Sequence, residues 1–176
     1  IPYLGMPILA QATALVLLFG WLGSFVILRW QPSRRILGFL LAAAIIGPHL
    51  LVGIGLKENV GRARPANIVE FGGWQTFTPA FVVSDQCQKN CAFVSAHVAS
   101  SAFLMAFGWL GAPVMRRRWL WAGAGFAAIL GLARMAQGGH FLSDVVFAYF
   151  AVYWGLWATE WLFRWRGWLP KQQNTY

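Results

Sequence analysis

The sequence predicts an all-α fold, a single polytopic bundle of transmembrane helices, and two observations lead to that prediction. First, hydrophobic residues make up 59% of the 176 residues and charged residues only 11%, and the mean hydropathy is +0.56. Soluble domains contain about a quarter charged residues, so this chain cannot cover a compact soluble surface. Second, apolar stretches approaching the roughly 20 residues that cross a bilayer recur along the chain. The same composition excludes a disordered chain and a disulfide-stapled miniprotein.

Five helical spans are predicted, and together they form one transmembrane domain over residues 1–176. Their approximate bounds are 7–28, 36–56, 93–111, 119–133 and 143–163. The fourth span is short, but Trp119 and Trp121 suit a membrane interface and the arginines before them can extend toward water. Because the chain begins with Ile1 rather than Met, a sixth helix or a cleaved signal segment is expected upstream.

Basic residues orient the predicted spans. In a soluble protein, a net charge of +9 would indicate nucleic-acid binding. Here we attribute the charge to basic residues at helix ends and expect no nucleic-acid partner. If the spans alternate in direction, most of the cations fall on one side, which the positive-inside rule assigns to the cytoplasm. These cations are Arg29, Arg34, Arg35, Arg116, Arg117, Arg118, Arg164, Arg166 and Lys171.

The connection over residues 57–92 is then extracytoplasmic. It is far longer than the other connections, and long loops in compact proteins usually carry function. Its glycines, prolines and aromatic residues suit an irregular segment in the headgroup region. Arg62 and Lys89 within it are interpreted as interfacial anchors.

Three groups of polar residues fall at the extracytoplasmic ends of the predicted helices. They are Lys57 with Arg64 and Pro65, then Ser95 with Ala96 and His97, then Arg134 with His140 and Asp144. Because the alternating topology places all three groups on one side, we expect them to share one pocket. Taken singly, each residue would be an interfacial anchor or an ordinary polar side chain, but their combined spacing rarely arises by chance.

The chemistry of these groups indicates a phosphate site. Lys57, Arg64 and Arg134 supply three cations with almost no acid beside them, and arginine matches phosphate oxygens with a two-pronged fork. Cations at this depth in a membrane tend to be functional. The Ser95 hydroxyl and the backbone N–H of Ala96, at the start of a helix, can donate to phosphate oxygens.

Two histidines supply candidate catalytic groups. His140 and Asp144 are four residues apart, so on one helical turn the carboxylate can reach the imidazole. A carboxylate on one ring nitrogen fixes the tautomer and leaves the other nitrogen free to attack phosphorus. His97 is then the general acid for the leaving oxygen.

The pattern Lys57-x6-Arg64-Pro65, Ser95-x-His97 and Arg134-x5-His140-x3-Asp144 resembles the three-part signature of the type 2 phosphatidic acid phosphatase (PAP2) superfamily. The resemblance covers residues 57–144 and implies a six-helix membrane phosphatase that works through a phosphohistidine intermediate with no metal or other cofactor. It implies that His140 is the nucleophile, Asp144 its partner and His97 the acid. The implied phosphate-binding residues are Lys57, Arg64, Ser95, Ala96 and Arg134.

This chain departs from the usual motifs at three positions. Val94 and Ala96 replace Pro and Gly in the second motif, and Ala133 replaces the Ser before the arginine of the third. Because alanine lacks the conformational freedom of glycine, Ala96 is expected at negative φ.

The 57–92 loop carries a finer resemblance. The segments Phe71-Gly72-Gly73, Thr78-Pro79-Ala80, Ser84-Asp85-Gln86-Cys87 and Asn90-Cys91-Ala92-Phe93 look like the bacterial lipid A phosphatase branch. That branch implies a phosphorylated lipid partner, such as lipid A 1- or 4′-phosphate, hydrolysed on the periplasmic face of the inner membrane. Undecaprenyl diphosphate and phosphatidylglycerol phosphate are alternative substrates, and a non-catalytic PAP2-like membrane subunit is the alternative function.

The chain has two cysteines, Cys87 and Cys91, both on the predicted extracytoplasmic side. Oxidation is permitted there, so we expect a short disulfide just before the second motif. Two thiols are too few ligands for a structural zinc site.

Overall fold

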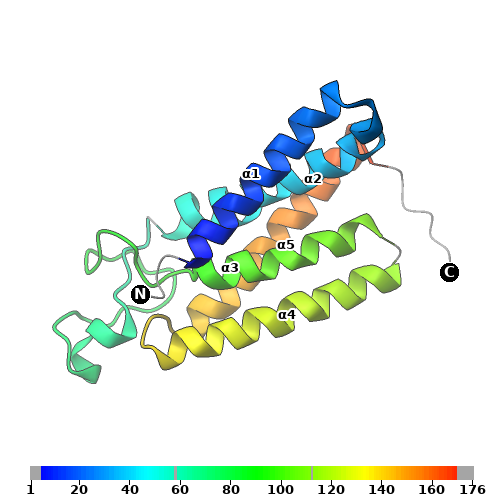
Figure 1. Ribbon diagram of the computed structural model, residues 1–176. Coiled ribbons are helices and arrows are strands. Elements are labelled where there is room, and N and C mark those ends of the chain that lie inside the picture. The colour runs from blue at the N-terminus through cyan, green and yellow to red at the C-terminus, as the bar shows by residue number, and fades with distance from the viewer. Residues whose placement is uncertain (1–4, 58, 112, 170–176) are drawn as a thin grey trace.

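The computed structural model describes residues 5–57, 59–111 and 113–169, and within these ranges the chain is a bundle of helices (Figure 1). No β-strand forms among the described residues, where the β-type contact is an isolated bridge between Ile68 and Gln75. The predicted all-α fold is therefore confirmed.

The first two predicted spans form a helical hairpin. Its elements are α1 (Gly5–Val26), the 3₁₀ helix η1 (Leu28–Ser33), α2 (Arg34–Ala44) and the π-helix η2 (Ile45–Lys57). Winding widens from α to π around Pro48, whose ring has no N–H to donate and clashes with an α-helical backbone. Arg34 ties the hairpin together by donating from Nη2 to the Ser24 carbonyl at 2.6 Å.

The remaining helices lie within the long connection or beyond it. They are the short 3₁₀ helices η3 (Pro65–Asn67) and η4 (Val69–Phe71), then α3 (Ala96–Ala102), the 3₁₀ helix η5 (Phe103–Leu110), α4 (Pro113–Ala136) and α5 (Leu142–Trp165). The prediction of a short fourth helix is wrong at its start. Helix α4 begins at Pro113, because proline suits the first helical position, where an N–H has no partner to lose.

Arginines at the start of α4 consequently lie inside that helix. Arg116 reaches the buried carboxylate of Glu160 in α5 at 3.4 Å, and its guanidinium lies 4.3 Å from the centre of the Trp109 ring. Glu160 also accepts a hydrogen bond from Arg164 at 2.9 Å. This shared carboxylate joins α4 to α5 at one end of the bundle.

The membrane character of the helices is confirmed in part. In the described part of the chain, two helices are long and apolar enough to cross a bilayer, Leu28–Lys57 and Pro113–Ala136. Gln11–Val26 and Ala96–Leu110 are shorter apolar helices. Many large apolar side chains remain exposed, which fits contact with lipid tails. Examples are Phe19, Phe25, Trp121, Trp154, Trp157 and Trp161.

The two ends of the bundle differ in content. The connection between η2 and α3 lies at the same end as the link from α4 to α5, whereas η1 and the end of α5 lie at the other (Figure 1). The predicted cytoplasmic arginines therefore share one end, opposite the long connection. Lys171, assigned with them, lies outside the described residues.

Close packing between η2 and α5 holds the centre of the bundle. A Cβ added at Gly155 would lie 2.7 Å from the Gly47 Cα, so a side chain there would force the two backbones apart. Phe39, Met105 and Leu156 are fully buried nearby in the core. This packing brings the end of η2 beside the start of α5.

Candidate active site

Backbone hydrogen bonds join the three motif-bearing segments at the loop end of the bundle. The Ala92 N–H donates to the Arg62 carbonyl at 2.9 Å, within the long connection. The Ser95 N–H donates to the Asp144 carbonyl at 3.1 Å, which ties the start of α3 to the start of α5. The site is thus assembled from segments far apart in sequence.

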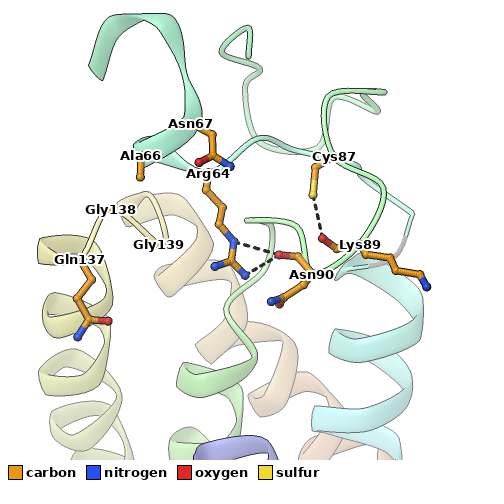
Figure 2. A pocket seen from close by; sticks show the side chains of 9 residues that line it. All are labelled: Arg64, Ala66, Asn67, Cys87, Lys89, Asn90, Gln137, Gly138 and Gly139. Atoms are coloured by element: carbon orange, nitrogen blue, oxygen red, sulfur yellow. Dashed lines mark hydrogen bonds between the residues drawn. The ribbon is translucent and has the colours of Figure 1, made fainter. Parts of the chain in front are cut away.

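The first predicted group contributes two cations. Lys57, the last residue of η2, donates from Nζ to the Cys91 carbonyl at 2.6 Å. Arg64 donates from Nε and Nη2 to the Asn90 carbonyl, at 3.0 and 2.6 Å, as the dashed lines in Figure 2 show. Both cations are therefore positioned by backbone oxygens of the same short segment.

The second predicted group lies at the start of α3. Ser95 is fully buried and is the N-cap residue, with its Oγ 3.5 Å from the Val98 nitrogen. Ala96 is the first residue of α3, so it has the negative φ that was expected of it. His97 has a buried Nε2 with no hydrogen-bond partner among the described residues.

The cations of the other two groups also interact electrostatically with His97. The positive charges of Arg134, Lys57 and Arg64 all act on its imidazole. The residues predicted to share one pocket are therefore close enough to interact electrostatically across three segments of the chain.

The third predicted group spans the link from α4 to α5. Arg134, in the last turn of α4, is buried and donates from Nη1 to the Gln137 side chain at 2.6 Å. His140 is 3% exposed, and its Nδ1 lies 2.7 Å from the Ala92 carbonyl. Because a carbonyl only accepts, Nδ1 carries the proton and Nε2 is left with the lone pair.

Asp144 differs from its predicted arrangement. Its Oδ2 lies 3.7 Å from His140 Nδ1, an ion-pair separation, and accepts a hydrogen bond from the Phe141 N–H at 2.7 Å. The physical reason is that His140 precedes α5, which begins at Leu142, so helical i to i+4 geometry does not apply to the pair. The hydrogen bond that fixes the imidazole tautomer comes from Ala92 instead.

Arg62 is the site residue that sequence reasoning missed. Its Nη1 donates to Asp144 Oδ1 at 2.6 Å and to Ser143 Oγ at 2.8 Å, and its Nε donates to the Thr78 carbonyl at 2.8 Å. The guanidinium lies 4.1 Å from the centre of the Phe141 ring. The interpretation of Arg62 as an interfacial anchor is therefore wrong, since it is almost completely buried. The available signal was that a buried aspartate needs a cation.

Burial sets the protonation of His140. Removal from water lowers the pKa of His140 below its ordinary value of 6.5, because burial penalises the charged imidazolium. The neighbouring Asp144 carboxylate and the Ala92 carbonyl act in the opposite direction. His140 is therefore a neutral, buried imidazole near pH 7, which is the form that can attack phosphorus.

The structure joins Cys87 and Cys91 in a disulfide, with their Cα atoms 5.5 Å apart. Cys91 is buried, whereas Gln88, Lys89 and Asn90 between the two cysteines are exposed. The disulfide thus closes a small surface loop immediately before the second motif.

A polar cavity of about 270 Å³ opens beside Arg64 (Figure 2). Its lining residues are Arg64, Ala66, Asn67, Cys87, Lys89, Asn90, Gln137, Gly138 and Gly139. Three of them carry carboxamides, which both donate and accept hydrogen bonds, two carry cations, and none is acidic. The cavity adjoins two of the candidate phosphate-binding arginines, because Arg64 lines it and Gln137 contacts Arg134.

Among the described residues, no three His, Cys, Asp or Glu side chains are grouped as metal ligands would be. The polar groups of the site are instead cations, imidazoles and backbone amides, and the carboxylate of Asp144 beside them is paired with Arg62. Such a set suits an anionic ligand.

The profile of the PAP2 superfamily matches residues 34–167. A lipid A 4′-phosphatase of Francisella tularensis subsp. novicida is 40% identical over 149 residues, which cover 81% of this chain and 65% of that protein. A lipid A 4′-phosphatase of Rhizobium leguminosarum is 40% identical over 119 residues, which cover 67% of this chain and 49% of that protein.

A third relative, a lipid A 4′-phosphatase of Rhizobium etli, is 36% identical over 105 residues, covering 60% of this chain and 41% of that protein. The chain therefore spans about two thirds or less of the length of these curated relatives. No solved structure matches it significantly.

Proposed function

Since the chain belongs to the PAP2 superfamily, we propose that it is a membrane lipid phosphatase that hydrolyses a phosphomonoester through a phosphohistidine intermediate. One observation carries the proposal: a buried, neutral His140 with its Nδ1 on the Ala92 carbonyl shares a site with an imidazole and three cations. In this arrangement an imidazole nitrogen can attack a phosphoryl group whose charge is already neutralised.

The first chemical step transfers the phosphoryl group to His140. The Nε2 lone pair forms a bond to phosphorus while the bond from phosphorus to the lipid oxygen breaks. The negative charge of the bound substrate phosphate offsets the cations that act on His97 and favours its protonated form. His97 then donates its proton to the leaving oxygen, so the lipid departs as an alcohol. Asp144, 3.7 Å from His140 Nδ1, stabilises the positive charge that develops on the ring.

The second step restores the enzyme. A water molecule attacks phosphorus, the bond from phosphorus to Nε2 breaks, and the water proton passes to His97. Inorganic phosphate then leaves. Negative charge accumulates on the phosphoryl oxygens in the transition state. The groups that hold these oxygens in both steps are Lys57, Arg64, Arg134, the Ser95 hydroxyl and the Ala96 N–H.

A phosphate on a sugar is the favoured substrate within this class, and lipid A 4′-phosphate is the specific proposal. Its first support is that the three relatives bear the name lipid A 4′-phosphatase. Its second support is the cavity beside Arg64, whose carboxamides suit the hydroxyl and amide groups of a sugar ring better than an alkyl chain. Undecaprenyl diphosphate offers a hydrocarbon chain next to its phosphates, and phosphatidylglycerol phosphate offers a glycerol.

The proposed location is a bacterial inner membrane, with the site facing the periplasm. The support is the charge distribution: the arginines of η1, of the start of α4 and of the end of α5 lie at the end opposite the site. The positive-inside rule places that arginine-rich end in the cytoplasm. The substrate phosphate is then on the periplasmic leaflet.

The test is release of inorganic phosphate by the purified chain in detergent with EDTA present. Lipid A, undecaprenyl diphosphate and phosphatidylglycerol phosphate are compared side by side, with His140→Ala as the inactive control. We expect lipid A to have the highest kcat/KM, and the 4′-phosphate to be lost rather than the 1-phosphate. Preference for either other lipid would overturn the sugar assignment, and no release from any lipid would favour a non-catalytic subunit.

A further inference from the structure

Three consecutive backbone carbonyls hold three side chains of the proposed site. The Asn90 carbonyl accepts from Arg64 Nε and Nη2, at 3.0 and 2.6 Å. The Cys91 carbonyl accepts from Lys57 Nζ at 2.6 Å, and the Ala92 carbonyl accepts from His140 Nδ1 at 2.7 Å. Two candidate phosphate-binding cations and the candidate nucleophile therefore all depend on the path of one three-residue segment.

The direction of these carbonyls depends on the backbone conformation of Asn90. Asn90 has φ of +55°, a left-handed conformation that non-glycine residues seldom adopt and that asparagine tolerates better than most. It turns the chain sharply just before Cys91. After the turn, the Ala92 N–H is held by the Arg62 carbonyl at 2.9 Å, and Cys91 and Ala92 are buried.

The residues before the turn are held less firmly than Cys91 and Ala92, which follow it. Gln88, Lys89 and Asn90 are exposed, so few packing contacts restrain them. The covalent restraint on this stretch is the disulfide from Cys87 to Cys91, which closes the loop around the turn. Because so short a loop gains little closure entropy, the disulfide acts on local geometry more than on global stability.

We propose that the disulfide-closed segment 87–92 is a positioning element of the active site, and that the enzyme is fully active only while Cys87 and Cys91 are oxidised. The inference rests on the proposed function for the roles of Lys57, Arg64 and His140. It adds that three residues without any catalytic side chain decide where those groups point, namely Asn90, Cys91 and Ala92. Reduction would release the turn and let the three carbonyls move away from their partners.

The first experiment compares oxidised and reduced protein. The full chain in detergent is treated with a phosphine reductant, and kcat, the inhibition constant of inorganic phosphate and the Tm are measured before and after. Misplacing reacting groups by about 1 Å can cost on the order of 10²-fold in rate, so we expect a loss of that order in kcat. Phosphate inhibition should weaken by about tenfold, as expected when charge-assisted contacts are disturbed. Reoxidation should restore both.

The controls separate positioning from folding. The Cys87→Ser/Cys91→Ser double variant should resemble reduced wild type and should not respond to reductant. A disulfide that only supports folding would lower the Tm while leaving kcat and the phosphate inhibition constant of the folded protein unchanged, and that result would overturn the proposal. Absence of turnover in the oxidised wild type would instead be a failure of the proposed function.

The second experiment moves the turn with the disulfide intact. Asn90→Val places a β-branched side chain at a positive φ, which it resists strongly, so phosphate inhibition should weaken. Asn90→Gly, which accepts that conformation freely, should lose less. Gln88→Val is the matched control, since Gln88 is exposed in the same loop without a positive φ. Equal inhibition constants for Asn90→Val and Gln88→Val would contradict the positioning role.

Discussion

Arg62 and Asp144, 82 positions apart in sequence, form a buried ion pair with 2.6 Å between Nη1 and Oδ1. Their side chains are 3% and 0% exposed, so water screens the pair little. The pair ties the long connection to the start of α5, where Asp144 also caps the helix through the Phe141 N–H. It therefore links the segment that carries Arg64 to the segment that carries His140.

Replacing Arg62 by methionine should strongly destabilise the protein. The change leaves the Asp144 carboxylate buried without its cation, and breaking a buried pair in this way costs about 3–5 kcal/mol. The measurement is equilibrium unfolding in mixed micelles. The double variant Arg62→Met/Asp144→Asn, in which neither charge remains, should regain part of that stability but not the activity. If the single variant is as stable as wild type, the pair is not a structural tie.

Glu160→Gln provides a comparison at the opposite end of the bundle. Its partners Arg116 and Arg164 are 23% and 24% exposed, so the free energy of unfolding should fall by less, about 1–3 kcal/mol. Because this carboxylate is remote from the proposed site, kcat and phosphate inhibition of the folded variant should match wild type. A change in phosphate inhibition would show that the two ends of the bundle are coupled.

The two histidines should respond differently to the leaving group. His140→Ala should abolish turnover of every substrate, because the atom that attacks phosphorus is gone. His97→Ala should lose about 10²–10⁴-fold on a lipid substrate, the usual contribution of a general acid. An aryl phosphate has a leaving oxygen that needs little protonation. Turnover of this substrate should therefore be partly restored in His97→Ala but not in His140→Ala. Equal losses on both substrates would contradict the assigned roles.

The acidic limb of the pH profile of kcat/KM should lie below pH 6.5. His140 must be neutral to attack, and burial lowers its pKa from that ordinary value, so activity should persist until the pH falls through the lowered pKa. Asp144→Asn removes a charge that raises the pKa of His140, so the limb should move further toward acid. Turnover of this variant should be much lower. An acidic limb above pH 6.5 would exclude a neutral buried His140 as the essential nucleophile.

Gly139→Ala should weaken phosphate binding. A Cβ at this position would lie 2.8 Å from Arg134 Nη2 and 3.2 Å from the Arg134 carbonyl oxygen, so the guanidinium must move away and the backbone must shift slightly. We expect phosphate inhibition to weaken several-fold. Gly125→Ala in α4 is the control, because nothing lies within 4 Å of the added carbon. Equal inhibition of the two variants would mean that the position of Arg134 is not limiting.

The sequence by itself determined the helical architecture and every candidate residue except Arg62. Hydropathy over consecutive residues is a local property, so the helices could be located, and alternation of their directions placed Lys57, His97 and His140 at one end. The start of α4 was missed because arginines usually mark the end of an apolar span. Here Arg116 finds Glu160 and the Trp109 ring instead, so the helix extends back to Pro113.

Only the tertiary structure decided the partner of each functional group. The Asp144 carboxylate lies 2.6 Å from Arg62 Nη1 but 3.7 Å from His140 Nδ1. His140 is held instead by a backbone carbonyl 48 positions away. Motif spacing could not reveal the second contact, because a hydrogen bond to a backbone oxygen leaves no residue-type signature in the sequence. For the first contact, spacing could not show which cation pairs with Asp144 across 82 positions. Such contacts depend on the path of the loop, which here is set by the left-handed turn at Asn90 and the disulfide closing around it.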